Sequence, residues 1–229
     1  MYLANLGNAL RSRSEWTGQR ADLDEAVAVG REAVDAAPAN HPDRPMYLSN
    51  LAHSLMTRFL QAGEQADLDA AVTAGQAAVD AAPVDHPDRA WMLSNLGGGL
   101  LLRYDRTGQL ADLSAAMMVN RAATDASPDD HPDRARMLLN LGSGLWSRYR
   151  RVGDPADAEA ATLAWQEAGA LPSAPASIRI RAARAWGVLA ASLGQWSVAV
   201  EGHAAAVHLL PLLAWRGVSR PSRERLLQD

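Results

Sequence analysis

The sequence predicts an all-helical protein in which similar helical hairpins stack one after another, an architecture known as an α-solenoid. Three observations predict it. Alanine and leucine dominate the composition while β-branched residues are sparse, which favours helices. A residue pattern recurs every 45 residues along the chain. Within each repeat, two stretches carry apolar residues at steps of three and four, the spacing of one helical face.

The repeat is marked most clearly by the tetrapeptide His-Pro-Asp-Arg, which begins at residues 41, 86 and 131. An asparagine, an arginine and a glycine recur with the same spacing. They are Asn5, Asn50, Asn95 and Asn140, then Arg13, Arg58, Arg103 and Arg148, then Gly18, Gly63, Gly108 and Gly153. A fixed period of this kind indicates a solenoid. We place the repeats at approximately 1–45, 46–90, 91–135, 136–174 and 175–215, with 216–229 as the start of a following or capping helix.

Each repeat is expected to hold two helices, called helix A and helix B here. In the second repeat, Leu51 and Leu55 belong to one apolar stripe of helix A, which ends near Gly63. A second periodic run begins after Asp67 and stops at Pro83, and it predicts helix B. Since one hairpin cannot bury both stripes, each repeat needs its neighbour for cover.

Residues at the expected helix ends suggest how the helices begin. Asp22 and Glu25 have the spacing of a capping box at the start of the first helix B. Pro42, Pro87 and Pro132 suit the first position of the next helix A, and the aspartate after each suits the positive end of the helix dipole. The His-Pro-Asp-Arg motif is therefore interpreted as punctuation between repeats.

The fifth repeat resembles the tetratricopeptide motif of 34 residues. The matching residues are Trp186, Gly187, Leu189, Ala190, Gly194, Trp196, Ala199, His203, Ala206 and Pro211. The earlier repeats resemble the same motif with seven extra residues between Gly7 and Ala26, which predict either about two more helical turns or a longer loop. The resemblance implies a single domain, 1–229, of about five hairpins in a right-handed superhelix that binds protein.

Arrays with repeats of about 45 residues also resemble those that precede caspase-like (CHAT-type) peptidase domains in large bacterial proteins. The segment from His208 to Gln228 resembles the junction they share. Such a peptidase needs a cysteine nucleophile, and this sequence contains no cysteine. The resemblance therefore implies a bacterial array that is a segment of a longer protein, with a caspase-like effector fused to it or associated with it.

Composition argues against several other functions. A net charge of -4 and a pI near 5.9 give no reason to expect a nucleic-acid or membrane partner. The sequence has neither a signal peptide nor an apolar stretch of about 20 residues, so we expect a cytoplasmic location. The three motif histidines lie in separate loops without a second ligand nearby, so no metal site is expected. We expect no cofactor and no enzymatic activity.

The asparagines at 45-residue spacing are the leading candidate binding residues: Asn5, Asn50, Asn95 and Asn140. A carboxamide can pair with a peptide main chain without recognising its side chains. In tetratricopeptide arrays this position faces the concave groove, and the superhelix of O-linked N-acetylglucosamine transferase is similar in carrying asparagines there. The alternative is that these side chains bond neighbouring helices and hold the repeats in register.

Two further groove positions vary between repeats. Met46, Trp91 and Arg136 lie four residues before an asparagine, and His53 lies three residues after one. Such variation is typical of residues that set specificity, and equally of drift on an exposed face. Met and Trp together would favour an apolar side chain in the ligand.

The repeated arginines have two interpretations as well. They could line a groove for carboxylates, or they could pair with Asp43, Asp88 and Asp133 between repeats. The structural interpretation is favoured, because a motif present at every joint usually serves the joint.

The sequence therefore predicts a non-catalytic scaffold that holds a protein or extended peptide in a groove lined by the A helices. The alternative is a structural spacer or self-assembly module of a larger protein. Its basis is an apolar cluster near the end of the sequence: Leu209, Leu210, Leu212, Leu213 and Trp215.

Overall fold

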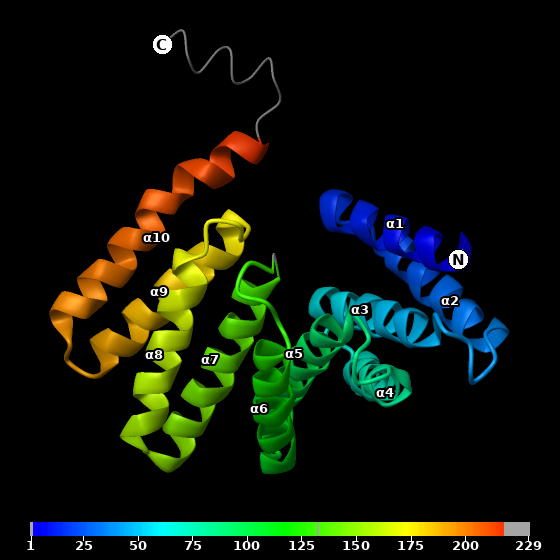
Figure 1. Ribbon diagram of the computed structural model, residues 1–229. Helices are drawn as coiled ribbons and strands as arrows, with labels where there is room; N and C mark the ends of the chain where they lie inside the picture. Colours follow the sequence, from blue (N-terminus) through cyan, green and yellow to red (C-terminus); the bar gives the residue numbers. More distant parts are fainter. Residues whose placement is uncertain (1, 132, 218–229) are drawn as a thin grey trace, which may run out of the picture. The chain divides into compact units, whose positions relative to one another are not determined.

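The computed structural model describes residues 2–131 and 133–217. Over these residues the chain forms ten helices and no strand, which agrees with the predicted all-helical fold (Figure 1). None of the described helices combines the length and the apolar character that crossing a membrane would require. The helices are α1 (Tyr2–Thr17), α2 (Arg20–Ala36), α3 (Arg44–Ala62), α4 (Gln65–Ala81), α5 (Arg89–Thr107), α6 (Leu110–Asp125), α7 (Arg134–Val152), α8 (Pro155–Ala170), α9 (Ala176–Ser192) and α10 (Trp196–Gly217).

Consecutive helices pack in pairs, so that α1, α3, α5, α7 and α9 take the place of helix A and the others that of helix B. The chain divides into two compact units. The first holds α1–α6 and ends at Ala126, and the second begins at Ser127 and holds α7–α10. Within the first unit, α3 lies against α1 and α5 as well as against α2 and α4. Within the second, α9 lies against both α7 and α8.

The seven extra residues of the early repeats lengthen the helices and not the loop between them. In the second hairpin, α3 has 19 residues and α4 has 17, and only Gly63 and Glu64 separate them. Gly63 ends α3 with φ 76°, a left-handed conformation that glycine adopts without strain. The same turn recurs with φ between 70° and 80° at Gly18, Gly108 and Gly153. Two-residue turns therefore keep each pair of long helices tightly antiparallel.

The predicted apolar stripes form the core. Leu51 and Leu55 of α3 are 8% and 2% exposed, and Leu68 and Ala78 of α4 are fully buried. Helix α3 packs against α2 of the preceding hairpin as well as against α4. Burying a leucine side chain contributes about 1.5–3 kcal/mol, so a substantial part of each hairpin's stability comes from its neighbour.

The helices begin at different residues from those that the sequence suggested. Helix α2 starts at Arg20 with Gln19 as its N-cap, and no side chain caps it. The capping box of Asp22 and Glu25 is therefore wrong, because the Asp22 carboxylate is bonded to an arginine instead. The expected first helical position was also wrong for Pro42, which lies in a turn two residues before α3 begins. Pro87 precedes α5 in the same way, and Pro132 lies outside the described residues.

Large and small side chains alternate where helices A and B of a hairpin meet. In the third hairpin, the fully buried Asn120 of α6 packs on Gly97, where an added Cβ would lie 2.0 Å from the Asn120 Oδ1. In the fourth, Trp165 of α8 packs on Gly142, where a Cβ would lie 2.5 Å from the indole Nε1. That Nε1 donates to the Leu139 carbonyl at 3.1 Å. Glycine at these two positions thus makes room for the side chain of the partner helix.

This packing predicts opposite outcomes for the same substitution at equivalent positions. Gly142→Ala should lower the free energy of unfolding by about 1–3 kcal/mol, because the methyl group overlaps Trp165. Gly7→Ala is the matched control, since its Cβ would be 3.5 Å from the Ala26 carbonyl, an ordinary contact. That control should be neutral or gain up to about 1 kcal/mol from helix propensity. Urea unfolding checks both, and equal effects would contradict the packing argument.

Candidate functional site

The histidines of the His-Pro-Asp-Arg motif cap the turn between hairpins. His41 Nδ1 accepts a hydrogen bond from the Asp43 backbone N–H at 3.1 Å. The same contact at the same distance joins His86 to the amide two residues later, and His131 likewise. One ring nitrogen of each histidine is therefore engaged in local structure.

The arginine of the same motif closes the end of the preceding helix B. Arg44 Nη1 donates to the Val34 carbonyl at 2.6 Å and to the Ala37 carbonyl. Arg89 makes the corresponding pair of bonds to the end of α4, at 2.9 and 2.6 Å. A positive charge at a helix C-terminus is favoured by the helix dipole. The motif thus joins the repeats, in agreement with its interpretation as punctuation.

The second set of repeated arginines joins the two helices of each of the first four hairpins. Arg58, near the end of α3, donates from Nε and Nη2 to the two carboxylate oxygens of Asp67 in α4, at 2.7 and 2.6 Å. The same two-bond geometry recurs in Arg13–Asp22, Arg103–Asp112 and Arg148–Asp157. All four carboxylates are buried.

The expected partners Asp43, Asp88 and Asp133 were therefore wrong. The repeated arginines do have a structural role, but each one pairs with an aspartate of its own hairpin and not with one between repeats. The two-residue turn brings the last turn of helix A opposite the first turn of helix B, and the aspartate there is nearer.

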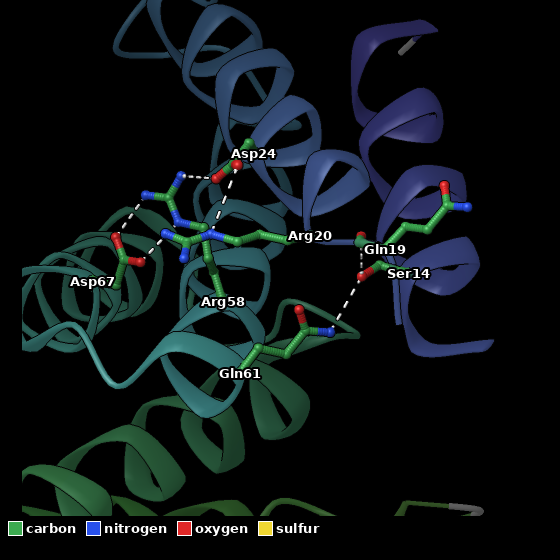
Figure 2. A network of polar contacts seen from close by, with 7 residues as sticks. All are labelled: Ser14, Gln19, Arg20, Asp24, Arg58, Gln61 and Asp67. Atoms are coloured by element: carbon green, nitrogen blue, oxygen red, sulfur yellow. Dashed lines mark hydrogen bonds and ion pairs between the residues drawn. The ribbon is translucent and has the colours of Figure 1, made fainter. Parts of the chain in front are cut away.

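Neighbouring hairpins of the first unit are joined by a polar network around α3 (Figure 2). Arg58 Nη1 also donates to Asp24 of α2 at 3.1 Å, so one guanidinium bridges two consecutive B helices. On the same helix, Gln61 Nε2 lies 3.3 Å from the Ser14 hydroxyl of α1. Ser14 in turn donates to the Gln19 carbonyl at 2.9 Å. These arginines are occupied by structural carboxylates, which argues against a groove role for them.

The four asparagines do not share one environment. Asn5 is exposed, Asn50 and Asn140 are half-buried, and Asn95 is only 7% exposed. In the described part of the chain, the Asn5 and Asn50 side chains make no hydrogen bond, so their carboxamides are open to a ligand. The series is thus uneven in exposure, although its spacing in the sequence is regular.

The other predicted groove residues also lie on A helices. His53 of α3 and Trp91 of α5 are brought together, with ring centroids 6.1 Å apart. Met46 is half-buried on α3. Arg136 of α7 is half-buried and lies 3.4 Å from the Asp133 carboxylate.

A cleft of about 380 Å³ lies between α7 and α9 in the second unit. Helix α7 contributes Ser143 and Trp146, helix α9 contributes Arg181 and Arg184, and Trp165 of α8 also lines it. The Trp146 ring is half-buried and stacks on Tyr149 with centroids 5.6 Å apart, while both arginines are exposed. This cleft joins aromatic surface to two positive charges.

Sequence reasoning missed Arg181 and Arg184, although a signal for the first was present. If the fifth repeat is aligned on Trp186-Gly187, Ala185 takes the position of the asparagines. Arg181 then lies four residues before it and Val188 three residues after it, which are the two variable groove positions. All three line the cleft. The fifth repeat has no asparagine to mark the register, so the 45-residue spacing alone does not identify its groove positions.

Charge is distributed unevenly between the two kinds of helix in the second unit. Helices α7 and α9 contain eight arginines and no aspartate or glutamate, as their sequences show. The acidic residues in the helices of this unit lie on α8 and α10, at Asp157, Glu159, Glu167 and Glu201. Three of these arginines pair with carboxylates outside α7 and α9, namely Arg134, Arg136 and Arg148. The other five, which include Arg181 and Arg184, make no ion pair among the described residues.

Comparison with solved structures shows the same kind of fold elsewhere. The crystal structure of MamA aligns with a TM-score of 0.58 and 17% identity, covering 89% of this chain and 96% of that one. The MamA RS-1 ArsTM double mutant aligns with a TM-score of 0.60 and 19% identity, covering 92% and 96%. No protein-family model matches the sequence, and no curated protein is significantly similar to it. The likeness shows an all-helical repeat fold that is consistent with a tetratricopeptide array.

The Arg13–Asp22 pair predicts a pH-dependent contribution to stability. The hydrogen bonds from Arg13 hold the pKa of Asp22 below its ordinary value, although burial opposes the shift. A lowered carboxylate pKa stabilises the fold above the unfolded-state pKa of about 3.9, and this contribution is lost as pH falls through the folded-state pKa. Asp22→Asn should therefore be less stable than the native protein at neutral pH, by a margin that shrinks below pH of about 4.

Urea unfolding across a pH series measures that margin. Asp35→Asn is the control, because Asp35 is exposed on the same helix and makes no ion pair among the described residues. It should lose no stability at neutral pH. A margin for Asp22→Asn that stays constant with pH would show that the pair does not act electrostatically.

Proposed function

We propose that this chain is a non-catalytic scaffold that holds an extended segment of a partner protein along its A helices. The observation that carries the proposal is the α7–α9 cleft, where equivalent groove positions of two successive A helices, Ser143 and Val188, line one cavity. Asn5 and Asn50 support it, because their carboxamides are available to pair with a main chain.

The repeated arginines and aspartates are engaged in contacts between helices, which leaves ligand binding to other residues of the A helices. The joint arginines donate to backbone carbonyls at the ends of B helices, and each arginine–aspartate pair joins the two helices of a hairpin. Arg58 also bonds to Asp24, which links two B helices. Because these repeated arginines and aspartates are engaged in structure, we propose no catalytic role for them. On α9, in contrast, Arg181 and Arg184 make no ion pair or hydrogen bond among the described residues.

We further propose a superhelical shape and an effector for this scaffold. A right-handed superhelix would give the A helices a common concave face, as the resemblance to tetratricopeptide arrays implies. The effector that such a scaffold would serve is, by the resemblance to bacterial arrays, a fused or associated caspase-like peptidase in the cytoplasm. The scaffold would then deliver a partner segment to that effector.

A second candidate function, self-association or spacing within a larger assembly, is favoured by the surface of α10. Trp196, Val200 and Val207 are 69%, 67% and 61% exposed, and Leu210 is 49% exposed. Residues spaced in this way share one side of a helix and can pack against another apolar surface. Of the expected leucine cluster, Leu209 instead packs against Ile180, Ala183 and Ala206 inside the unit. The side chains of Leu213 and Trp215 lie outside the described residues.

The scaffold function predicts that peptides of unrelated sequence lose affinity together when the asparagines are removed. An array of random extended peptides identifies binders, and their dissociation constants are then measured by fluorescence anisotropy. Asn5→Ala combined with Asn50→Ala should weaken these binders about tenfold, the effect of losing one or two hydrogen bonds. Asn40→Ala, an exposed asparagine in a joint, is the control and should change nothing.

Circular dichroism and thermal melting should be unchanged in the double variant, because neither side chain bonds to the described part of the chain. Binders whose affinity is the same in all three proteins would contradict main-chain recognition by the asparagines. An array that yields no binder at all would contradict the peptide-binding function itself.

Self-association makes a separate prediction. If α10 mediates it, Val200→Glu should shift sedimentation toward the monomer, because a charge would be placed in an apolar contact. Val84→Glu alters an exposed valine in a joint of the first unit and is the matched control. Monomeric behaviour of the native protein over a wide concentration range would exclude this function for the isolated chain.

A further inference from the structure

We infer that the α7–α9 cleft binds an acidic segment of the partner, with carboxylates paired to Arg181 and Arg184 and an apolar side chain against the Trp146 ring. This inference rests on the proposed scaffold function, and it names the chemistry of the ligand. The cleft, the unbalanced charge and the aromatic lining support it independently.

The shape of the cleft follows from the helical period on its two walls. On α7, Leu139, Ser143 and Trp146 recur at steps of four and three, so they lie along one stripe. On α9, Arg181 and Arg184 are three residues apart and share a face. The volume of about 380 Å³ lies in the range of small ligand sites and accommodates a few side chains of a peptide.

The charge of the cleft is not balanced by the protein. Neither Arg181 nor Arg184 makes an ion pair or hydrogen bond within the described residues, and neither α7 nor α9 contains an acidic residue. Like charges three or four residues apart on a helix are unfavourable by a few tenths of a kcal/mol. In the first unit, by contrast, Arg58 bonds to two carboxylates. An incoming carboxylate would therefore find two unpaired guanidinium groups at this cleft.

Two other polar groups on the walls of the cleft are already used. The Trp165 Nε1 and the Ser143 hydroxyl both donate to the Leu139 carbonyl, at 3.1 and 2.8 Å. Trp165 is only 3% exposed, so the ring surface that the cleft offers comes mainly from half-buried Trp146 of α7, which stacks on Tyr149. Aromatic surface beside a positive rim suits an apolar residue flanked by aspartate or glutamate.

A peptide is favoured over a nucleic acid. Both ligands carry negative charge that pairs with arginine. Nucleic-acid binding, however, usually uses a broad basic surface, whereas this chain has a net charge of -4. A cleft of a few side chains with two arginines fits a short acidic sequence better than it fits a backbone of regularly spaced phosphates.

The test uses the full chain and a fluorescein-labelled synthetic peptide of alternating aspartate and leucine with capped ends. Its twin has asparagine in place of every aspartate. Arg181→Gln combined with Arg184→Gln should weaken the aspartate peptide about tenfold or more, as loss of two charge-assisted contacts implies. Arg150→Gln combined with Arg151→Gln makes the same charge change at exposed positions of α7 outside the cleft and should alter affinity less than about twofold.

Two further measurements locate the binding. The asparagine twin should bind native protein about as weakly as the aspartate peptide binds the cleft variant. Trp146→Ala should weaken both peptides by a similar factor, because the ring contacts the leucine in either case. Circular dichroism should be unchanged in both arginine variants, since none of the four side chains makes a hydrogen bond or ion pair among the described residues.

Several outcomes would overturn the inference. Equal loss of affinity in the two arginine variants would show that binding depends on net charge and not on the cleft. A single-stranded oligonucleotide that binds more tightly than the peptide, through the same two arginines, would reassign the site. If peptides selected on the random array depend on Asn5 and Asn50 while the cleft variant binds them normally, the scaffold function stands and the acidic subsite falls. If neither set of variants affects any peptide, both fall together.

Discussion

The arginine–aspartate pair across the turn of each of the first four hairpins is the interaction on which the rest of the structure depends. Each of the four aspartates is buried at the start of a helix B, and a buried carboxylate is strongly unfavourable without a partner. The arginine that satisfies it stands at the end of helix A, so both helix ends must occupy one position relative to each other. Arg58 extends this constraint to Asp24 of the previous hairpin, which links successive B helices as well. Within the first unit, these contacts consequently fix each hairpin against the preceding one.

Much of this organisation is predictable from the sequence because it is local. The steps of three and four in Leu51 and Leu55 identify a buried helical stripe, and the recurring glycines identify left-handed turns, since both depend only on backbone geometry. The function of Asp22 was not predictable in this way. An acidic residue near a helix start can cap that helix or pair with a distant cation, and only the position of Arg13 across the turn decides between these roles.

The candidate site shows the same limit. Spacing places the asparagines at equivalent helical positions, but it does not determine how deeply each is covered, and Asn95 is buried while Asn5 is exposed. Burial depends on the side chains of neighbouring helices, which differ between repeats. In the fifth repeat the reverse holds. Its groove positions are predictable from the tetratricopeptide register. Because the repeat has no asparagine, however, the spacing alone does not identify Arg181, which the structure places in the cleft.

The distribution of charge connects stability to function. In the joints and hairpin turns, each repeated arginine has carboxylate or carbonyl partners that the fold itself supplies, so these contacts specify the stacking of the helices. In the α7–α9 cleft, two arginines stand together without such a partner, beside tryptophan rings and on helices without acidic residues. Departures from local balance of this kind tend to occur where a protein meets a ligand. The same residue type therefore has two functions in this chain, and whether the fold provides its counter-charge distinguishes them.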